Sequence, residues 1–300
     1  MVAVIKAGDR EHALSRISIW SMSWIFVWCV VKPTDAAFEI GGGGAHSTAL
    51  GGALSTSVKS PESVWFNPAP SARIGTSIVS STHGTLWSGL EESPSVHSVN
   101  GAWVSRWGTV QVGYATLRAQ GWDEKRLLLG ASRVLSARFA LGAQIQRNSW
   151  DAGRLGRYHW VGNMGFLYEA GWVTKKTYVR FSGVLANVGS SLRSEGRRTG
   201  QRPRSITLGM QVVGNGRIGN VDWRREGDCW ELRVGYESEL RDYLMVRIGT
   251  RLFFADTVNR TGHAGLGYEW RNLRFDYAFS QSYDLSRFGA QHRFGVGYVW

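Results

Sequence analysis

Histidine and serine are the residues of this chain whose side chains could act in catalysis or, for histidine, bind a metal ion. The seven histidines show no spacing typical of a metal site, and nothing in the sequence places a serine beside a histidine, as a hydrolase requires. The glycine run at 41–44 is not followed by the Lys-Ser/Thr pair of a phosphate loop. We therefore expect no catalytic residues, no metal site and no cofactor, and classify the protein as a non-enzyme.

Charged side chains are the remaining candidates, and they are spread along the whole chain. With 35 basic and 23 acidic residues, the formal net charge is +12. A nucleic-acid-binding protein would gather such charge on one helix or stripe, whereas here single arginines recur within alternating segments. Together with the export signal described below, this distribution argues against a nucleic-acid partner. The role of these arginines therefore depends on the secondary-structure elements in which they lie.

From residue 73 onward, apolar or aromatic residues alternate with small, polar or charged ones, which is the period of a β-strand with two unlike faces. A soluble sandwich accounts for any single strand of this kind, because its charged face would meet water. It does not account for the aromatic residues that recur at strand ends, as in membrane barrels. The clearest strand places Trp230, Leu232, Val234 and Tyr236 on one face and Glu231, Arg233, Gly235 and Glu237 on the other.

If the sheet closes into a membrane barrel, the charged faces of its strands must point into the lumen. A charge on the lipid face would cost roughly 2–4 kcal/mol near the membrane midplane. Within the lumen, we expect these side chains to form internal ion pairs. The lumen-facing candidates are Arg233, Glu237, Arg247, Arg251, Glu269, Arg274 and Asp276.

The segments long enough to cross a bilayer as tilted strands number about fourteen. Short links near 106–108, 135–136, 214–216, 239–242 and 271 alternate with longer ones at 84–94, 119–124, 148–157, 187–203, 254–261 and 281–289. Bacterial barrels have short periplasmic turns and longer outer loops in the same alternation. The predicted strands are 73–83, 95–105, 109–118, 125–134, 137–147, 158–170, 176–186, 204–213, 217–224, 229–238, 243–253, 262–270, 272–280 and 290–300.

Residues 1–37 are typical of a signal peptide. Arg10 and Arg16 precede an apolar run over residues 17–31, which at about 15 residues is too short to span a bilayer comfortably. Small residues permit cleavage near Ala36 or Ala37. The alternative is an uncleaved N-terminal anchor helix. The segment predicts export, and with the alternating strands it predicts a location in the bacterial outer membrane.

Residues 38–72 break the alternation and are rich in Gly and Ala. They are too short to bury a core alone, so we expect them to form a hatch enclosed by the lumen. The hatch ends in a turn at Asn67-Pro68-Ala69, where Pro68 excludes the helical conformation for Asn67. Residues 73–300 then form the barrel.

The last predicted strand ends the chain with aromatic residues on one face. Phe294, Tyr298 and Trp300 share that face. Outer-membrane proteins commonly end in this way, which implies recognition by the barrel-insertion machinery.

The stretch Val64-Trp65-Phe66-Asn67-Pro68-Ala69, after a Gly/Ala-rich segment, resembles the start of the PorV/PorQ family, whose relatives are the FadL-type (OMPP/FadL/TodX) fatty-acid transporters. Where that family continues with glycine, this chain has Pro70. Family-like blocks follow in order at 183–189, 202–209 and 273–294, so the resemblance covers about residues 38–300. It implies a fourteen-stranded barrel with a hatch lodged in the lumen.

The resemblance also implies a function. A PorV-like barrel would be an accessory or cargo-handling component of protein secretion (type IX-like), with secretion-system components as partners. The first alternative is a FadL-like channel for uptake of long-chain fatty acids or other hydrophobic small molecules, and the second is a structural barrel without transport. The modest outer loops favour the secretion hypothesis, because FadL-type transporters tend to be longer. In each case we expect a barrel embedded in outer-membrane lipid.

Overall fold

The computed structural model describes residues 43–300 apart from 154, 175, 195–196, 201–202 and 256. The predicted signal peptide, its cleavage site near Ala36 or Ala37, and residues 38–42 of the predicted hatch lie outside the described residues. No helix within the described ranges is long and apolar enough to cross a membrane.

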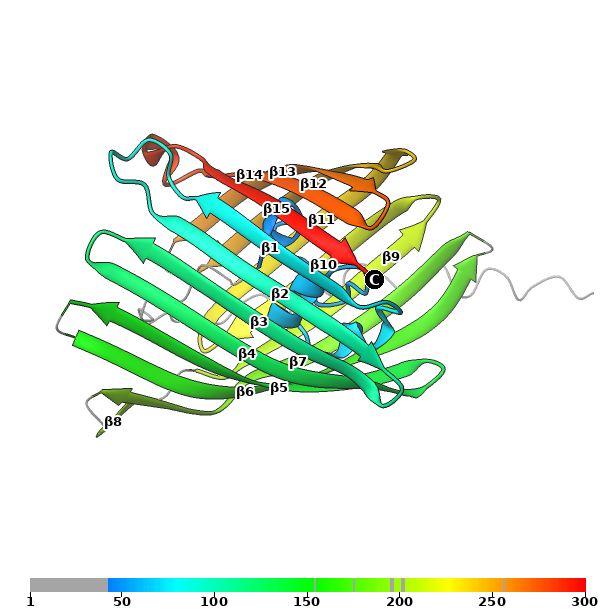
Figure 1. The fold of residues 1–300 in the computed structure, drawn as a ribbon, viewed down its shortest axis with the longest axis horizontal. Coiled ribbons are helices and arrows are strands. Elements are labelled where there is room, and N and C mark those ends of the chain that lie inside the picture. The colour runs from blue at the N-terminus through cyan, green and yellow to red at the C-terminus, as the bar shows by residue number, and fades with distance from the viewer. Residues whose placement is uncertain (1–42, 154, 175, 195–196, 201–202, 256) are drawn as a thin grey trace, which may run out of the picture.

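The described chain folds as one closed antiparallel β-barrel of fourteen strands (Figure 1). Sequential strands pair with each other, β1 pairs with β15, and β7 pairs with β6 on one side and with β9 on the other. A further short strand, β8, pairs only with β7. The predicted all-β barrel is therefore confirmed. The strands are β1 (Ile78–Thr85), β2 (Ser95–Ser105), β3 (Gly108–Ala119), β4 (Trp122–Ser136), β5 (Phe139–Ala152), β6 (Leu155–Thr174), β7 (Thr177–Ser194), β8 (Arg197–Gly200), β9 (Ser205–Gly214), β10 (Arg217–Glu226), β11 (Cys229–Arg241), β12 (Leu244–Phe254), β13 (Val258–Trp270), β14 (Leu273–Ser282) and β15 (Gln291–Val299).

Several predicted boundaries are wrong. The first strand begins at Ile78 instead of residue 73, because the preceding residues form a 3₁₀ turn, η3 (Ala69–Arg73). The expected links at 119–124 and 148–157 are mostly strand, since Gly121 and Gly153 adopt positive φ angles (69° and 70°) that permit very tight turns. The expected link at 187–203 contains the end of β7 and the whole of β8.

The two ends of the barrel differ. Tight turns at 106–107, 137–138, 215–216, 242–243 and 271–272 lie at one end, which we call the turn end. The opposite end, the loop end, carries the longer connections 86–94 and 283–290, the latter with the short helix η4 (Ser286–Phe288). The strict alternation of long and short links expected from the sequence is thus reduced to a few long loops at one end.

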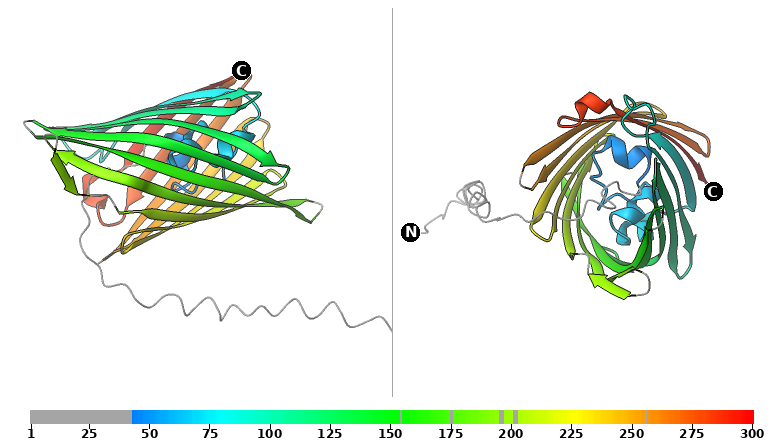
Figure 2. Two further views of the ribbon diagram at one scale, coloured as in Figure 1. Left: turned by 90° about the horizontal axis from the view of Figure 1, so that it is seen from below. Right: turned by 90° about the vertical axis from the view of Figure 1, so that its left-hand side faces the viewer.

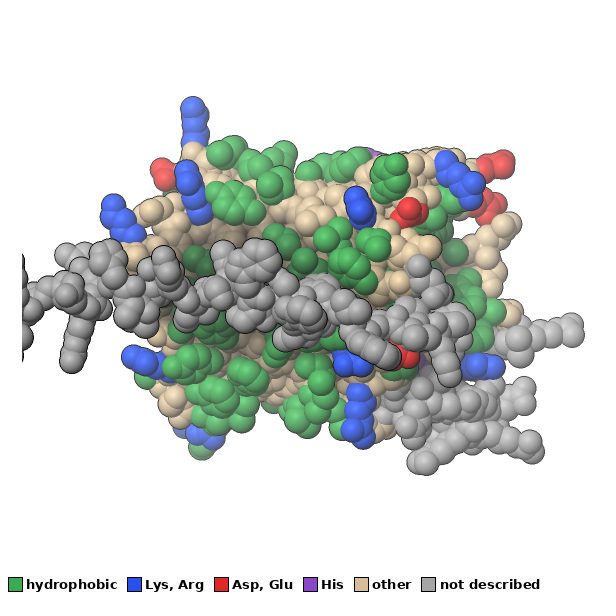
Figure 3. Space-filling view, turned by 180° about the vertical axis from the view of Figure 1, so that it is seen from behind, with side chains coloured by type: hydrophobic (Ala, Val, Ile, Leu, Met, Phe, Trp, Pro, Cys, Tyr) green, Lys and Arg blue, Asp and Glu red, His purple; other side chains and the backbone are tan. Residues whose placement is uncertain are grey.

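The outer wall of the barrel is apolar. Exposed side chains on its strands include Val99, Leu129, Ile145, Ile248 and Leu266, each at least 45% exposed. Figure 3 shows hydrophobic side chains over much of the visible wall, with many charged ones toward its two ends. In a soluble protein, so large an apolar surface would be a liability, whereas a lipid bilayer covers it.

Three short helices lie inside the barrel (Figure 2). They are α1 (Ala45–Ala49), η2 (Pro61–Trp65) and η3. Helix α1 contacts β12, β13, β14 and β15, whereas η3 contacts β3, β4, β5 and β6 across the lumen. The segment from Gly43 to Arg73, which we call the hatch, therefore joins two opposite walls of the barrel.

Candidate functional site

Glycines of the lumenal wall make room for the hatch. A Cβ atom at Gly249 would lie 2.5 Å from the backbone of Gly51 and Leu50, and one at Gly142, on the opposite wall, would lie 2.6 Å from the backbone of Pro68. Real Cβ atoms essentially never come within 3.0 Å of another heavy atom in this way. The alternation of Gly with larger residues along these strands is thus what allows the hatch backbone to approach the wall.

The hatch has an internal brace of its own. Helix α1 has only five residues and no side-chain cap at Gly44. The carboxylate of Glu62 supplies that cap, because one of its oxygens accepts hydrogen bonds from the backbone N–H groups of Gly44 (2.9 Å) and Ser47 (2.7 Å). A carboxylate is favourable at the positive end of a helix. These hydrogen bonds link α1 to η2, so these two helices of the hatch also contact each other and not only the wall.

A chain of ionic contacts joins the hatch to β11, β12 and β14. His46 Nε2 lies 3.2 Å from Glu237 Oε2, and Arg247 Nε donates to the same oxygen at 2.5 Å. Arg247 then contacts Asp276 at 2.7 Å, and Arg274 contacts the other oxygen of Asp276 at 3.0 Å. Arg247 is completely buried. Charges buried this deeply must be paired, and here the pairing ends on a hatch side chain.

Burial lowers the pKa of His46 below its ordinary value of 6.5. The positive charges of Arg274 and Arg247 act in the same direction, while the hydrogen bond to Glu237 opposes them. The imidazole is therefore neutral at pH 7 and donates its Nε2 proton to Glu237. Its Nδ1 atom is buried and has no hydrogen-bond partner among the described residues.

A second polar anchor lies between the hatch and β10. The backbone N–H of Ser55 donates to one carboxylate oxygen of Asp222 at 2.9 Å, and the Ser55 hydroxyl donates to the other at 2.5 Å. Ser182 on β7 lies 2.8 Å from the same hydroxyl. Arg233 on β11 reaches the carbonyl of Gly52 at 3.4 Å. Ser55 and Asp222 are completely buried, so neither group can exchange its partner for water while the hatch is in place.

The Asn67-Pro68-Ala69 turn attaches the hatch to the opposite wall. The Asn67 side-chain amide donates to the carbonyls of Ser55 (2.8 Å) and Phe166 (3.1 Å), and its oxygen accepts from Ala69 N–H (3.0 Å). The amide of Gln111 on β3 donates to the Pro68 carbonyl at 2.6 Å. The turn thus connects hatch, β3 and β6 through buried hydrogen bonds.

Toward the loop end, three arginines surround one glutamate. Glu231 is almost completely buried, with Arg233 at 2.6 Å, Arg224 at 3.4 Å and Arg251 in close contact. Arg224 also contacts Glu226. With three arginines and two glutamates in contact, the charge of this cluster is largely compensated within the wall.

The structure places most of the residues expected in the lumen on the inner face of the wall. Glu269 differs, because its side chain is 48% exposed at the turn end and lies 3.9 Å from Arg274. The aromatic residues of the last strand point outward, and their role in insertion stays a prediction. The buried or half-buried lumenal residues are Arg233, Glu237, Arg247, Arg251, Arg274 and Asp276, and the outward ones are Phe294, Tyr298 and Trp300, at 60%, 46% and 48% exposed.

The sequence analysis missed the residues that hold the hatch from the wall side. Asp222 and Gln111 lie at inward positions of strands that were expected, so the alternation alone could have placed them in the lumen. Nothing in the sequence pairs Asp222 with Ser55, which lies 167 residues earlier. The capping role of Glu62 likewise depends on the hatch folding back on itself.

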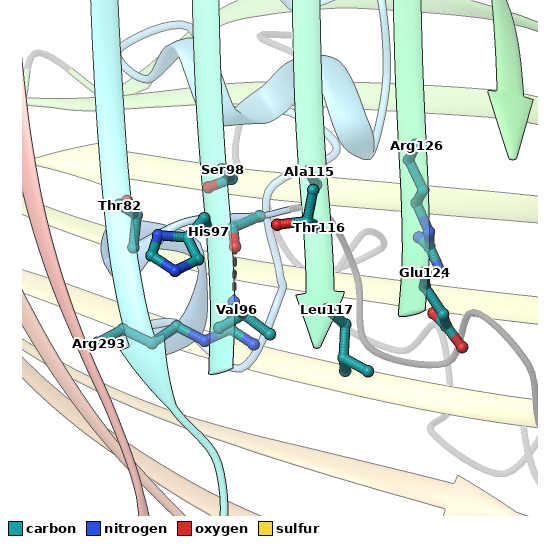
Figure 4. A pocket seen from close by; sticks show the side chains of 11 residues that line it. Thr82, Val96, His97, Ser98, Ala115, Thr116, Leu117, Glu124, Arg126 and Arg293 are labelled. Atoms are coloured by element: carbon teal, nitrogen blue, oxygen red, sulfur yellow. Dashed lines mark hydrogen bonds between the residues drawn. The ribbon is translucent and has the colours of Figure 1, made fainter. Parts of the chain in front are cut away.

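Two small cavities flank the hatch. The first, about 20 Å³, lies toward the loop end and is lined by Thr82, Ser98, Glu124, Arg126 and Arg293 among others. Figure 4 shows it with the hydrogen bond from Arg293 to the Gly43 carbonyl (2.6 Å) as a dashed line.

The second cavity, about 110 Å³, lies toward the turn end beside Lys59, Arg180, Gln211 and Glu237. A water molecule needs roughly 10–15 Å³ of such space. These two cavities therefore have room for a few water molecules while the hatch is in place.

Comparison with known proteins gives a fold and no family. No family model matches the chain, and no curated protein matches it in sequence. Among solved structures, the Pseudomonas putida toluene transporter TodX superposes with a TM-score of 0.62 at 13% identity, covering 87% of this chain and 98% of that one. The monoaromatic hydrocarbon channel CymD gives 0.58 at 11% identity, with 88% and 98% covered. The Ralstonia pickettii toluene transporter TbuX gives 0.57 at 13% identity, with 87% and 99% covered. The chain therefore has the FadL/TodX-like barrel fold.

Proposed function

We propose that this protein is an outer-membrane channel for hydrophobic small molecules whose lumen is closed by the N-terminal hatch. The observation that carries the proposal is the fit between the hatch and the lumenal wall, with glycines that receive its backbone and buried polar side chains that hold it. All these contacts are noncovalent, so the hatch can yield to a ligand. The names of the similar structures, toluene transporters and a hydrocarbon channel, support the same function.

The charges of the loop-end cavity favour an amphipathic ligand over a wholly apolar one. Arg126, Arg293 and Glu124 line this cavity, together with Thr82 and Ser98, so its charged lining carries one net positive charge. A hydrocarbon would form no polar contact with this lining. A long-chain fatty acid offers a carboxylate to the arginines and an apolar tail. We therefore rank long-chain fatty acids above monoaromatic hydrocarbons as ligands.

The secretion function expected from the PorV/PorQ resemblance gains no support from the comparisons. The argument that favoured it was the brevity of the outer loops. This chain nevertheless spans 98% of the TodX structure, so short loops do not separate it from such a channel. A structural barrel without transport would have no need of a hatch fitted to the lumen.

The test compares the intact protein with a variant lacking residues 45–66, each purified and inserted into planar lipid bilayers. We expect a small conductance from the intact protein and a sharply higher one from the variant. Equal conductances would contradict the hatch as a plug. Uptake of fluorescent long-chain fatty acids and of toluene into liposomes then tests transport, and saturable fatty-acid uptake that requires the protein is the expected result. Uptake of neither compound would leave the structural role standing.

A further inference from the structure

Two histidines face each other on the outer wall, near the loop end. His83 on β1 lies directly opposite His97 on β2 in the antiparallel register. Their neighbours Thr82 and Ser98 are buried on the lumenal side, whereas both histidines are exposed. Neither imidazole takes part in the contacts that hold the hatch. Both imidazoles are therefore accessible from outside the barrel, although His97 also borders the loop-end cavity.

The two imidazoles are close enough to share one metal ion. The Nδ1 atom of His83 lies 3.3 Å from Nδ1 and 3.2 Å from Nε2 of His97, and the ring centroids are 4.4 Å apart. A metal ion with two imidazole ligands at about 2.0–2.1 Å holds their nitrogens roughly 2.9–3.4 Å apart in square-planar or tetrahedral geometry. Both nitrogen–nitrogen distances fall within that range.

The surroundings restrict the kind of ion. Directly across the sheet from the pair lie Phe294 on β15 and Thr116 on β3, so the flanking positions offer no carboxylate. The described residues contain no group of three or more His, Cys, Asp or Glu side chains that could hold a metal ion. Ca²⁺ and Mg²⁺ require a set of oxygen ligands, whereas imidazole suits nickel, copper and zinc. The remaining coordination positions would face outward, away from the barrel wall.

We propose that His83 and His97 bind one divalent transition-metal ion, which bridges β1 and β2 on the outer wall. Affinities should follow the general order for nitrogen ligands, with Cu²⁺ tighter than Ni²⁺. Because the ion binds only the folded barrel, it also stabilises the pairing of these two strands. The inference does not rest on the proposed channel function, since metal binding uses two exposed imidazoles and no hatch residue.

The experiment titrates NiCl₂ into folded, tag-free protein in detergent and follows binding by isothermal titration calorimetry. We expect one Ni²⁺ per chain, a loss of affinity of about tenfold or more in His83→Gln and in His97→Gln, and no saturable binding in the double variant. His292→Gln is the matched control, because His292 is another histidine of the outer wall and is occupied by the Tyr277 hydroxyl at 2.9 Å. Its affinity should equal that of the unmodified protein.

A spectroscopic measurement separates this site from binding elsewhere. With one equivalent of Cu²⁺, electron paramagnetic resonance should show coupling to two imidazole nitrogens in the unmodified protein and to one in each single variant. Gel mobility of unheated samples verifies that every variant is folded. Absence of saturable binding in the unmodified protein, or an unchanged affinity in the double variant, would overturn the proposal.

Discussion

Gly249 is the residue at which the fit between hatch and wall can be tested most directly. The backbone of Gly51 and Leu50 occupies the space that a Cβ atom at this position would need. Gly249→Val should therefore displace α1 from its seat. Overpacking of this kind costs about 1–3 kcal/mol, so the population of open hatch should rise by roughly 5- to 150-fold. Single-channel recording should show longer or more frequent openings than in the unmodified protein.

The matched control lies on the next strand. A Cβ at Gly262 on β13 would meet nothing within 4 Å, and this glycine is exposed on the outer face. Gly262→Val should leave the conductance unchanged. If both variants behave alike, the effect at Gly249 comes from a general loss of strand stability and the hatch seat is not responsible.

His46 should make the closed hatch sensitive to acid. Burial and the nearby Arg274 and Arg247 lower the pKa of His46 in the closed state, although Glu237 opposes them. The released hatch then binds a proton more readily than the closed one, so closure is favoured fully above the ordinary pKa of 6.5 and weakens as pH falls below it. Hydrogen exchange of the hatch amides, referenced to the strands, should accelerate between pH 7 and pH 5 beyond the intrinsic effect of pH.

The control for this pH dependence removes the titrating group. In His46→Gln the hatch keeps a side chain that can donate to Glu237 but cannot titrate. The acid-induced loosening should then disappear. If His46→Gln loosens by the same amount on acidification, other groups of the lumen are responsible.

At the scale of elements, the strand pattern could be predicted from the sequence and the outer connections could not. Alternation identified every strand of the ring, including 217–224, which is β10. The alternation does not predict that strands continue past the expected loops. Beyond the membrane both faces of a strand meet water, so apolar and polar residues no longer alternate. The alternation also could not pair His83 with His97, which lie 14 residues apart and meet only through the register of β1 and β2.

For the hatch, too, the sequence predicts the location of the segment and not the residues that it contacts. The composition of residues 38–72 predicts an enclosed segment, and the described part lies in the lumen. Its partners follow from long-range contacts such as Ser55 with Asp222, which no local pattern encodes. Local periodicity thus specifies which face of a strand is lumenal, while three-dimensional closure decides what meets there.

Asn67 should control how firmly η3 is attached to the wall. Asn67→Ala removes the hydrogen bonds to Ser55, Phe166 and Ala69 and leaves buried groups unsatisfied, at a cost of about 1–3 kcal/mol. Hydrogen exchange of residues 52–70 should become roughly 5- to 150-fold faster. Asn272→Ala is the control, since Asn272 also donates to a carbonyl but sits exposed in a turn. No difference between the two variants would contradict a special role for Asn67.

The last strand should be needed for insertion. Tyr298 and Trp300 point outward and stack with ring centroids 5.9 Å apart, and the backbone N–H of Trp300 donates to Ser77 at 3.0 Å. Replacing both with glutamate should lower the amount of folded protein in the outer membrane while export continues, because charge on the outer wall is costly. Fractionation of cells with detection of the unheated, folded form measures this. A normal yield would remove the role assigned to the C-terminal residues.

At the scale of the whole molecule, the barrel and the hatch stabilise each other unequally. Strand pairing continues around the ring without a free edge, through both the β1–β15 and β6–β7 seams, so the hatch supplies none of the pairing that closes the ring. The hatch adds contacts between opposite walls, from α1 on β12–β15 to η3 on β3–β6. Removing it exposes buried charges such as Arg247 and Asp222 to water, where their existing partners matter less.

The variant lacking residues 45–66 should therefore keep its fold but lose stability. We expect it to migrate faster unheated than heated on a denaturing gel, as the intact barrel should, and to unfold at a lower temperature in a heating series. Arg247 retains Glu237 and Asp276 as partners on the wall, whereas Asp222 loses the hydrogen bonds from Ser55. The loss of stability therefore comes from the missing cross-lumen contacts. If the variant shows no heat-dependent mobility, the hatch is required for closure itself, and the ring of strands alone does not account for the stability of the barrel.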